Sequence, residues 1–447
     1  MKIVLVALNA RYTHSNPAVR YLRNEITAEG HDAFIREYSI NQNYFDILDS
    51  ITKESPDVIA FSVYIWNTDI VRALIPDIAK LLPGIRIILG GPEAGYNPAC
   101  WTGIPGVTAV IKGPGEDAIR TLAANEFQTH GDTGIVIAEK KRHFSDIPFP
   151  YTDEDFEILS NRYIYYESSR GCPFACSYCL SSREDHATEF RSAEQTISEL
   201  DRIIKADALV VKFVDRSFNA DPARAREIWA HCIRNGGKSR FHFEIHPLLL
   251  SDDDFNLLAD APEGLFQFEI GVQSIHDKTL REIGRKSEWR HIRGKIERLV
   301  AMRNIHTHLD IIAGLPFETL EDIAESIDEV MSLGADHFQL GFLKVLPGTV
   351  MAERESDYGI VRTERAPYQI LANKWIDSDG ITLLRKMDRL IDTTYNDAVD
   401  RTHFIDFVER KGGFFNSYLC MIEHAEKTGF DMTTKNKARL DAFISSI

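Results

Sequence analysis

In the first third of the chain, hydrophobic positions follow two alternating spacings. Short, continuous apolar runs such as residues 2–8 are typical of strands covered on both faces. Between the runs, apolar residues recur at three- and four-residue steps, for example over 69–82, which is the period of a helix. This alternation predicts an α/β fold that begins with a Rossmann-like, doubly wound parallel sheet. Its predicted strands are 2–8, 32–38, 58–63, 86–89 and 107–111, with 134–138 closing the sheet.

A second series of strand–helix units follows from about residue 160. Ser192 and Gln195 form a capping-box start for one helix, and residues 319–322 start another. Six such units predict a partial (β/α)6 barrel, in which functional groups lie at the carboxyl ends of the strands. Polar residues do interrupt the apolar runs at those ends. The predicted strands are 163–167, 209–214, 241–245, 267–272, 308–313 and 337–343.

The two regions are joined by a segment rich in proline and acidic residues, which favours extended chain over helix. Beyond residue 350 the apolar spacing is helical, and we expect this C-terminal extension to cover the open side of the barrel. Its predicted helices include 368–376, 384–395 and 440–447. The sequence therefore predicts domains at 1–142, 160–350 and 351–447, with a linker at 143–159.

Composition narrows the choice of partners and compartment. The chain has 447 residues, 44% of them hydrophobic and 26% charged, which is an ordinary globular balance. Its net charge of −16 argues against nucleic acid and anionic membrane as partners, because phosphate binding relies on clustered Lys and Arg. Cys100, Cys232 and Cys420 are scattered, so the six cysteines form no disulfide framework. The run at 2–8 is too short to span a membrane. We expect a cytoplasmic protein.

The remaining three cysteines, Cys172, Cys176 and Cys179, have a C-x3-C-x2-C spacing within one loop. A loop this short can bring three thiolates to one soft metal centre. A four-iron four-sulfur cluster normally takes four protein ligands, so three would leave one iron open to a small molecule. The alternatives are a zinc knot, which usually needs four ligands, and a structural thiol cluster.

This loop, with Tyr178 before the last cysteine, resembles the cluster loop of the radical S-adenosylmethionine (SAM) enzymes. The resemblance implies that the three cysteines hold a 4Fe-4S cluster, that SAM binds the free iron, and that its cleavage yields a 5′-deoxyadenosyl radical. Many members have Gly-Gly-Glu where this chain has Asp215-Arg216-Ser217, so the carboxylate that takes the SAM amine stays open. The SAM-binding residues implied by the resemblance are Tyr178, Asp215, Glu244, Gln273, Arg285 and Asp310.

The glycines that end strands of the first sheet resemble those of the cobalamin-binding domain that precedes many radical SAM cores. Domains that ligate cobalt carry Asp-x-His-x-x-Gly, which is absent here. His14 is therefore either a lower cobalt ligand or a loop histidine bound to backbone or water, and a purely structural first domain is also open. The implied cobalamin-binding residues are Asn9, His14, Ser62, Tyr64, Asn67, Gly90, Gly91, Glu93, Gly115 and Glu116.

Over about residues 1–350, the resemblance implies an oxygen-sensitive, cobalamin-dependent radical SAM transferase. The implied reaction is methylation of an unactivated carbon of a small molecule or peptide, using the 5′-deoxyadenosyl radical and methylcobalamin. An electron donor such as flavodoxin or ferredoxin is the implied partner. Two alternatives stay open: a cobalamin-assisted rearrangement or cyclisation without methyl transfer, and a non-catalytic cluster-containing redox or scaffold protein. The sequence identifies no catalytic side chain, substrate or oligomeric state.

Overall fold

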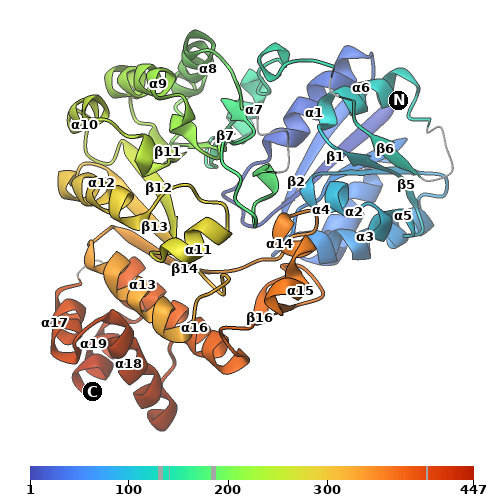
Figure 1. The fold of residues 1–447 in the computed structure, drawn as a ribbon. Coiled ribbons are helices and arrows are strands. Elements are labelled where there is room, and N and C mark those ends of the chain that lie inside the picture. Colours follow the sequence, from blue (N-terminus) through green and yellow to red (C-terminus); the bar gives the residue numbers. More distant parts are fainter. Residues whose placement is uncertain (129–133, 140, 183–187, 399–400) are drawn as a thin grey trace.

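The computed structural model describes residues 1–447 except 129–133, 140, 183–187 and 399–400. Two six-stranded parallel sheets organise the chain, and a helical region follows them (Figure 1). The predicted fold class is confirmed: an α/β first domain, a partial parallel barrel and a helical C-terminal part. None of the helices in the described residues combines the length and apolar composition needed to cross a membrane.

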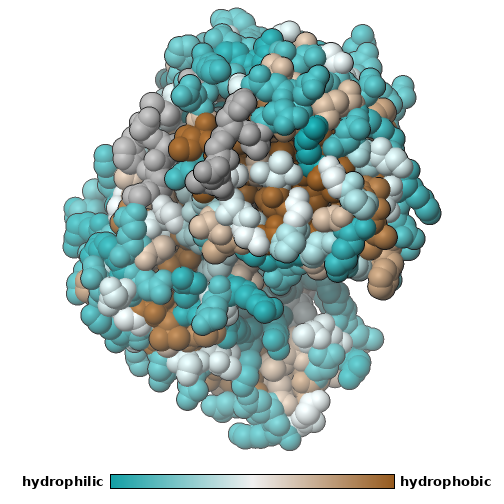
Figure 2. All heavy atoms as spheres, turned by 90° about the vertical axis from the view of Figure 1, so that its right-hand side faces the viewer, coloured by the Kyte–Doolittle hydropathy of each residue, from teal (hydrophilic) through white to brown (hydrophobic). Residues whose placement is uncertain are grey.

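The first sheet has the strand order β2-β1-β3-β4-β5-β6, and its core lies on both faces. Along β1, Ile3, Leu5 and Ala7 pack on the side of α1 and α6, whereas Val4, Val6 and Leu8 pack on the side of α2 and α3. This two-sided burial explains the continuous apolar runs. Viewed from the first domain, the surface is largely hydrophilic with hydrophobic patches between the polar side chains (Figure 2). The elements are β1 Lys2–Asn9, α1 Pro17–Ala28, β2 Asp32–Ser39, α2 Tyr44–Lys53, β3 Val58–Ser62, α3 Thr68–Leu81, β4 Arg86–Gly90, α4 Pro92–Tyr96, α5 Ala99–Thr102, β5 Val107–Lys112, α6 Gly115–Ala124 and β6 Ile135–Ile137.

The second sheet has the order β14-β13-β12-β11-β10-β7, with every neighbouring pair parallel. Helices cover one of its faces (Figure 1). The elements are β7 Ile164–Tyr166, α8 Ala193–Lys205, β10 Val210–Phe213, α9 Pro222–Asn235, β11 Arg240–Glu244, α10 Asp252–Ala259, β12 Phe266–Gln273, α11 Asp277–Glu282, α12 Trp289–Met302, β13 His306–Ala313, α13 Leu320–Ser332 and β14 His337–Phe342, with a short antiparallel pair β8 Ser169–Arg170 and β9 Glu189–Phe190.

Side chains of this sheet alternate between its two faces, apart from an irregularity between Gly271 and Gln273 of β12. On β12, Phe266, Phe268, Ile270 and Val272 join the hydrophobic core under the helices, and Glu269 points to the opposite face. The other strands follow the same rule, so the concave face of the barrel is polar. We call this face the inner wall; its residues are Tyr165, Lys212, His242, Glu244, Glu269, His308, Asp310 and His337.

Two local predictions are wrong. In the linker, Thr152 and Asp155 form a capping box that starts α7 (Asp153–Ile158), so this part is helical and not extended. A 3-10 turn, η1 (Phe144–Asp146), precedes it. The predicted helix 368–376 is instead a strand, β16 (Ile370–Ala372), paired with β15 (Val361–Arg362). The backbone of this segment forms hydrogen bonds with the chain that follows β14, and Ile370 N donates to Leu343 O at 2.9 Å.

The C-terminal helices pack against the last part of the barrel (Figure 1). The side chain of Asn396 bonds both backbone groups of Phe338, which covers the edge of β14. The N-terminus of α18 is held on α13, where Phe415 N donates to Asp328 Oδ1 at 2.8 Å. The elements are α14 Val350–Glu353, α15 Glu355–Tyr358, α16 Ser378–Ile391, a π-helical turn Asp392–Asn396, α17 Thr402–Lys411, α18 Phe414–Thr428 and α19 Lys437–Ser445.

Candidate functional site

The cysteine loop begins beyond the carboxyl end of β7 and is held first by Asp215. One oxygen of Asp215 accepts from Ser168 N at 2.9 Å, and the other accepts from Ser168 Oγ and Ser169 Oγ, each at 2.6 Å. Asp215 is 1% exposed, and burial raises its pKa against these hydrogen bonds. Both oxygens of this predicted SAM residue therefore already serve the loop, which favours Glu244 as the partner of the SAM amine.

The middle of the loop is held from two further elements. Ser177 N donates to Ile283 O, and Met351 N donates to Ser177 O, each at 2.8 Å. Gly284 has a φ of +77°, and a Cβ added there would lie 2.4 Å from the carbonyl oxygen of Ala175. Only glycine fits this position without strain. The sequence reading missed Ile283 and Gly284; the available signal was a glycine after the helix that precedes Arg285.

The three thiols are partly withdrawn from solvent: Cys172 and Cys176 are buried and Cys179 is half-buried. In the part of the chain that the structure describes, no three His, Cys, Asp or Glu side chains converge as they would around one metal ion. An iron–sulfur cluster binds each cysteine through a different iron, so its ligands stand further apart. The donor set therefore fits a cluster with three protein ligands.

Two guanidinium groups lie near the thiols. Arg285 Nη1 lies 4.0 Å from Cys176 Sγ. Burial raises the pKa of the Cys176 thiol, and Arg285 opposes that rise. The pKa of Arg216 is raised, chiefly by Glu244 and also by the nearby Cys179 and Cys172.

Three predicted SAM residues meet at the end of β12, around Gly271. Arg285 Nη2 donates to Gly271 O at 2.5 Å. The Gln273 amide lies over Gly271 so closely that a Cβ there would be 2.0 Å from Gln273 Nε2. Burial raises the pKa of Tyr178, and the Arg285 guanidinium opposes the rise. The structure thus gathers Tyr178, Gln273 and Arg285 beside the cysteine loop.

Glu244 and Asp310, the other predicted SAM residues, belong to the inner wall. The Glu244 side chain is 32% exposed, yet burial raises its pKa to about 7, so it lines an inner space rather than the outer surface. Its Oε1 lies 3.6 Å from Arg216 Nη1. Asp310 is directly opposite Gly271 in the strand register, which places it at the level of the Arg285 group.

Deeper in the barrel lies a histidine–carboxylate group that the sequence reading missed. His242 Nε2 is 3.0 Å from Glu269 Oε2, and His308 Nε2 is 2.8 Å from Asp310 Oδ1. The pKa of Glu269 is lowered, because His242 and His308 outweigh the effect of burial. The signal was the alternation of apolar and polar residues along 266–273, which turns every second side chain into the barrel.

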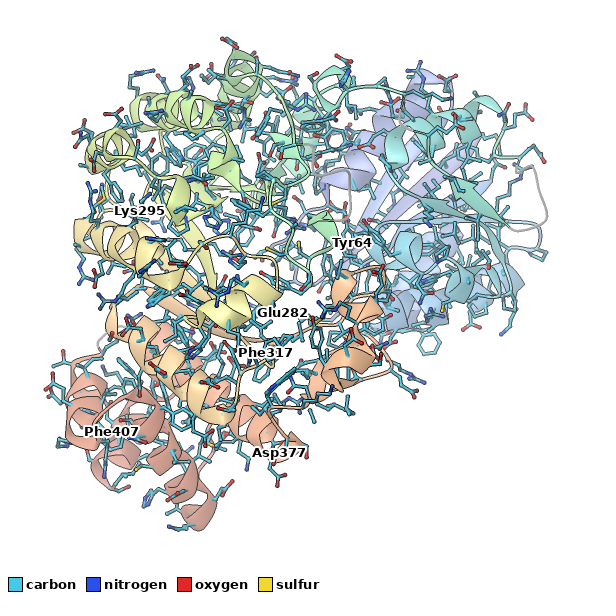
Figure 3. The ribbon with its side chains drawn as sticks, viewed as in Figure 1. Tyr64, Glu282, Lys295, Phe317, Asp377 and Phe407 are labelled. Carbon is cyan, nitrogen blue, oxygen red and sulfur yellow. The ribbon has the colours of Figure 1, made fainter. Side chains whose placement is uncertain are left out.

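In the first domain, several predicted cobalamin residues meet at the carboxyl edge of the sheet. Asn67 Nδ2 donates to Leu8 O at 3.1 Å and to Ser62 O at 3.0 Å. Tyr64 stacks on Trp66 with ring centroids 4.4 Å apart, and Trp66 is 44% exposed. Figure 3 shows Tyr64 between the first domain and the barrel. The edge therefore offers a flat aromatic surface toward the barrel, which fits a planar ring system such as a corrin.

The other predicted cobalamin residues have structural contacts of their own. Gly91 has a φ of +98°, and Gly90 pairs with Ser62 in the strand register. Asn9 donates to His14 O at 3.1 Å, and an added Cβ on Gly115 would meet Leu22 at 3.1 Å.

His14 faces the barrel. Its Nδ1 lies 2.8 Å from the Tyr165 hydroxyl, and burial lowers its pKa. The structure thus gives this loop histidine a side-chain partner rather than backbone or water, and a role as cobalt ligand rests on the resemblance alone.

Two predicted cobalamin residues tie the first domain to the rest of the chain. Glu116 Oε1 accepts a hydrogen bond from Arg170 Nη2 at 2.5 Å. Arg170 stands two residues before Cys172 in the chain. Burial would raise the pKa of Glu116, but Arg170 holds it below its ordinary value. Glu93 accepts a hydrogen bond from the hydroxyl of Tyr368.

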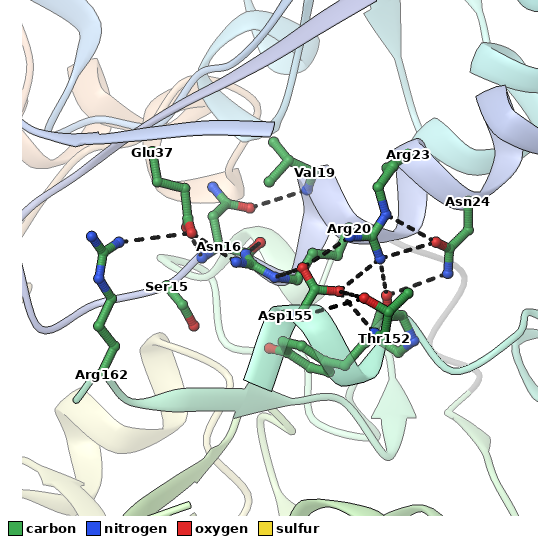
Figure 4. Close-up of polar contacts among 12 residues, drawn as sticks. Ser15, Asn16, Val19, Arg20, Arg23, Asn24, Glu37, Thr152, Asp155 and Arg162 are labelled. Carbon is green, nitrogen blue, oxygen red and sulfur yellow. Dashed lines mark hydrogen bonds and ion pairs between the residues drawn. The ribbon is translucent and has the colours of Figure 1, made fainter. Parts of the chain in front are cut away.

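A second polar network fixes the first domain on the barrel (Figure 4). Arg23 Nη2 of α1 pairs with Asp155 Oδ2 of α7 at 2.8 Å, and Arg20 pairs with Glu37 at 2.8 Å. Arg162, just before β7, lies 3.7 Å from Glu37. The network therefore ties the first domain to the segment that leads into β7.

Comparison with known families matches three parts of the chain. Residues 3–123 match the model of the B12 binding domain, and residues 166–330 match that of the radical SAM superfamily. Residues 356–442 match a model described as a protein of unknown function, DUF4080.

Individual proteins match large parts of the chain in sequence or in fold. The cobalamin-dependent radical SAM methyltransferase TokK of Streptomyces tokunonensis is 25% identical over 349 residues, which cover 70% of this chain and 51% of TokK. The chain thus spans about half the length of this curated relative. The cobalamin-dependent SAM radical enzyme OxsB has the same fold, with a TM-score of 0.70 at 15% identity over 99% of this chain and 75% of OxsB. So does the radical SAM methyltransferase TsrM of Kitasatospora setae, with a TM-score of 0.64 at 20% identity over 81% and 77% of the two chains.

Proposed function

Because the chain joins a B12-binding domain to a radical SAM domain, whose cofactors are a 4Fe-4S cluster, SAM and cobalamin, we propose that it methylates an unactivated carbon. The observation that carries the proposal is the fixed arrangement of the cysteine loop against the first domain, through Arg170 and Glu116. Transfer between two cofactors needs both reactive centres to face one substrate. The description of TokK as a methyltransferase supports the same reaction.

When bound, the cluster and SAM supply a radical that removes a substrate hydrogen atom, and cobalamin supplies the methyl group that replaces it. The chain's own contribution is to bind and orient. In the proposal, Cys172, Cys176 and Cys179 hold the cluster. Arg285 pairs with the SAM carboxylate, because a guanidinium offers bidentate geometry. Glu244 accepts from the SAM amine.

The remaining assignments follow the geometry of the two edges. Gln273, Asp310 and Tyr178 contact the ribose and adenine of SAM, since they surround Gly271. In the first domain, the glycine turns at Gly90 and Gly91 allow close approach of a nucleotide tail. We assign the other contacts of cobalamin to Asn9, His14, Ser62, Tyr64, Asn67, Glu93, Gly115 and Glu116.

The proposal extends to partners and compartment. The substrate is a small molecule or a peptide, and a flavodoxin or ferredoxin supplies the electron. None of the six cysteines forms a disulfide, and three of them lie in one loop, which suits a reducing cytoplasm.

The test is anaerobic turnover with SAM that carries a trideuterated methyl group. Protein reconstituted with cluster and cobalamin is incubated with reductant and a cell-derived small-molecule and peptide pool. Formation of 5′-deoxyadenosine together with a product that carries the labelled methyl group supports the proposal. 5′-deoxyadenosine without label transfer would instead support a rearrangement, and no 5′-deoxyadenosine would support a non-catalytic cluster protein. Cys176→Ala should lose SAM cleavage, whereas Cys100→Ala, an exposed cysteine, should retain it.

A further inference from the structure

The inner wall is polar, whereas the interior of a closed (β/α)8 barrel is filled mostly by Val, Ile and Leu. Its side chains stand in register on neighbouring strands. Lys212 is directly opposite Tyr165 on one side and His242 on the other. Glu269 is likewise opposite both Glu244 and His308. Burying so many polar groups costs free energy unless each one is paired, so unpaired members are informative.

Most of the wall satisfies itself. His242 Nε2 and Glu269 are 3.0 Å apart, and His308 is 2.8 Å from Asp310. Among the described residues, His308 Nε2 and Asp310 Oδ1 lack hydrogen-bond geometry despite their short distance, and two further groups, the Lys212 ammonium and His242 Nδ1, have no partner within bonding distance. The Lys212 ammonium has no hydrogen bond or ion pair there and lies 5.1 Å from the ring centroid of Tyr163. His242 is 5% exposed, and in the described chain its buried Nδ1 has no hydrogen-bond partner.

The two leftover groups have complementary hydrogen-bonding properties. Lys212 carries only donors. His242 directs Nε2 toward the Glu269 carboxylate, which makes Nε2 a donor, and the second ring nitrogen, Nδ1, accepts a hydrogen bond when it carries no proton. Because the two residues are direct neighbours across β10 and β11, one ligand can reach both.

Lys212 lies among charged groups of both signs. The pKa of His308 is raised, because Asp310 and Glu269 outweigh burial, and this histidine joins Lys212 and Arg216 as positive groups. Glu244 is half neutral near pH 7, since burial raises its pKa to about 7. Glu269 and Asp310 are acidic groups of the same wall, and burial lowers the pKa of Lys212 while Glu269 and Glu244 oppose that fall, so groups of both signs lie around the Lys212 ammonium.

We propose that Lys212 and His242 bind the substrate of the methyl transfer, and that this substrate carries a carboxylate next to an N–H or O–H group. The carboxylate accepts from the Lys212 ammonium, and the neighbouring N–H or O–H donates to His242 Nδ1. N-acylated amino acids and 2-hydroxy acids have this pattern. The assignment rests on the proposed function and names the substrate class of the same site.

Binding of paired probes tests the assignment directly. The holoprotein, loaded with cluster and cobalamin, is mixed with a set of N-acetyl amino acids and with their methyl esters, and affinities are measured by saturation-transfer NMR titration. The acids should bind roughly tenfold more tightly than the esters, since a charge-assisted hydrogen bond is lost in the ester. Lys212→Met should bring the ratio to about one, whereas Lys212→Arg should keep a preference for acids. Lys205→Met, an exposed lysine on α8, should behave as wild type.

Three results would overturn the assignment: equal affinity for acids and esters, no binding of either in the wild type, or a preference for acids that persists in Lys212→Met. His242→Phe should weaken the binding of N-acetyl amino acids more than that of their N-methylated analogues, which lack the N–H group. Transfer of the labelled methyl group by the wild type, in the turnover assay described above, reports on the proposed function separately. If that reaction is absent, the proposed function fails. If it occurs without a preference for acids, only the substrate class fails.

Discussion

Replacing Gly284 with alanine should loosen the cysteine loop. Gly284 has a φ of +77°, a conformation that costs an L-residue about 1–2 kcal/mol. The added Cβ would also lie 2.4 Å from Ala175 O and 3.2 Å from Ala175 C. These are backbone atoms, which cannot turn away as a side chain can. Close contacts of this kind cost typically about 1–3 kcal/mol. The folded chain should lose about 2–5 kcal/mol, or the loop should move and lose iron.

Gly334→Ala separates the two contributions. Gly334 has a φ of +73° at the end of α13, and nothing lies within 4 Å of an added Cβ. Gly334→Ala should therefore lose the part of the free energy of unfolding that a positive φ costs, without the further cost of a close contact at the added Cβ. Its iron content should stay that of the wild type. Gly294→Ala, within α12 with open space around it, should stabilise by about 0.5–1 kcal/mol.

The assay is denaturant unfolding of the apoprotein, combined with iron and sulfide content after anaerobic reconstitution. The account predicts that Gly284→Ala unfolds more easily than Gly334→Ala by about 1–3 kcal/mol, or that it alone loses iron. Equal stability of these two variants, together with full iron content in Gly284→Ala, would refute the claim that Gly284 holds the loop in place.

Three further substitutions test other parts of the account. Gly91→Ala would place a Cβ 2.6 Å from Val63 O, so the amount of cobalamin retained on gel filtration should fall. Gly84→Ala, with open space around the added Cβ, should retain cobalamin as the wild type does. Equal retention by the two variants would contradict the assignment of Gly91 to the cobalamin site. Glu116→Gln removes one partner of the buried Glu116–Arg170 ion pair, so the free energy of unfolding in denaturant should fall by about 3 kcal/mol. Glu29→Gln, in an exposed ion pair, should lower it by only about 0–1 kcal/mol. Equal effects of the two substitutions would argue that the Glu116–Arg170 pair does not hold the first domain on the cysteine loop. The Glu244 carboxyl has a pKa of about 7 and binds the SAM amine only when ionised, so SAM affinity measured by calorimetry should rise from about pH 6 to 8. Glu244→Gln should abolish this rise. A rise that persists in Glu244→Gln would mean that another group accepts from the SAM amine.

The elements of both sheets could be predicted because their burial leaves direct marks in the sequence. Residues 2–8 are apolar on both faces, and β1 indeed has helices on both sides. The capping boxes at Thr319 and Thr152 show the limit of that approach. The first marks a helix in the sequence, but around the second the prolines at 148 and 150 favour extended chain, although the structure forms a helix after Thr152. The segment 368–376 has helical spacing, yet its backbone is bonded to Leu343 and Val345, a tertiary contact that no local pattern encodes.

For the site, the type of residue could be predicted but not its partner. The cysteine spacing identified the loop, but Gly284, which supports it from another element, becomes visible only when the chain is folded. Asp215 and Glu244 are both acids at strand ends and look equivalent in the sequence. Only the hydrogen bonds of Ser168 and Ser169 show that Asp215 is already engaged. The inner wall is encoded in the alternation of polar and apolar residues within the strands, so the polar residues at the strand ends do not reveal it.

The central claim is a cluster that three protein thiolates hold and whose fourth iron is open to SAM. Electron–nuclear double resonance of the reduced, reconstituted protein with SAM labelled by ¹⁵N at the amine tests it most directly. The account predicts a ¹⁵N coupling to the cluster that appears on addition of SAM and is absent from Cys176→Ala. A full set of protein ligands with no ¹⁵N coupling, or zinc in place of iron, would contradict it.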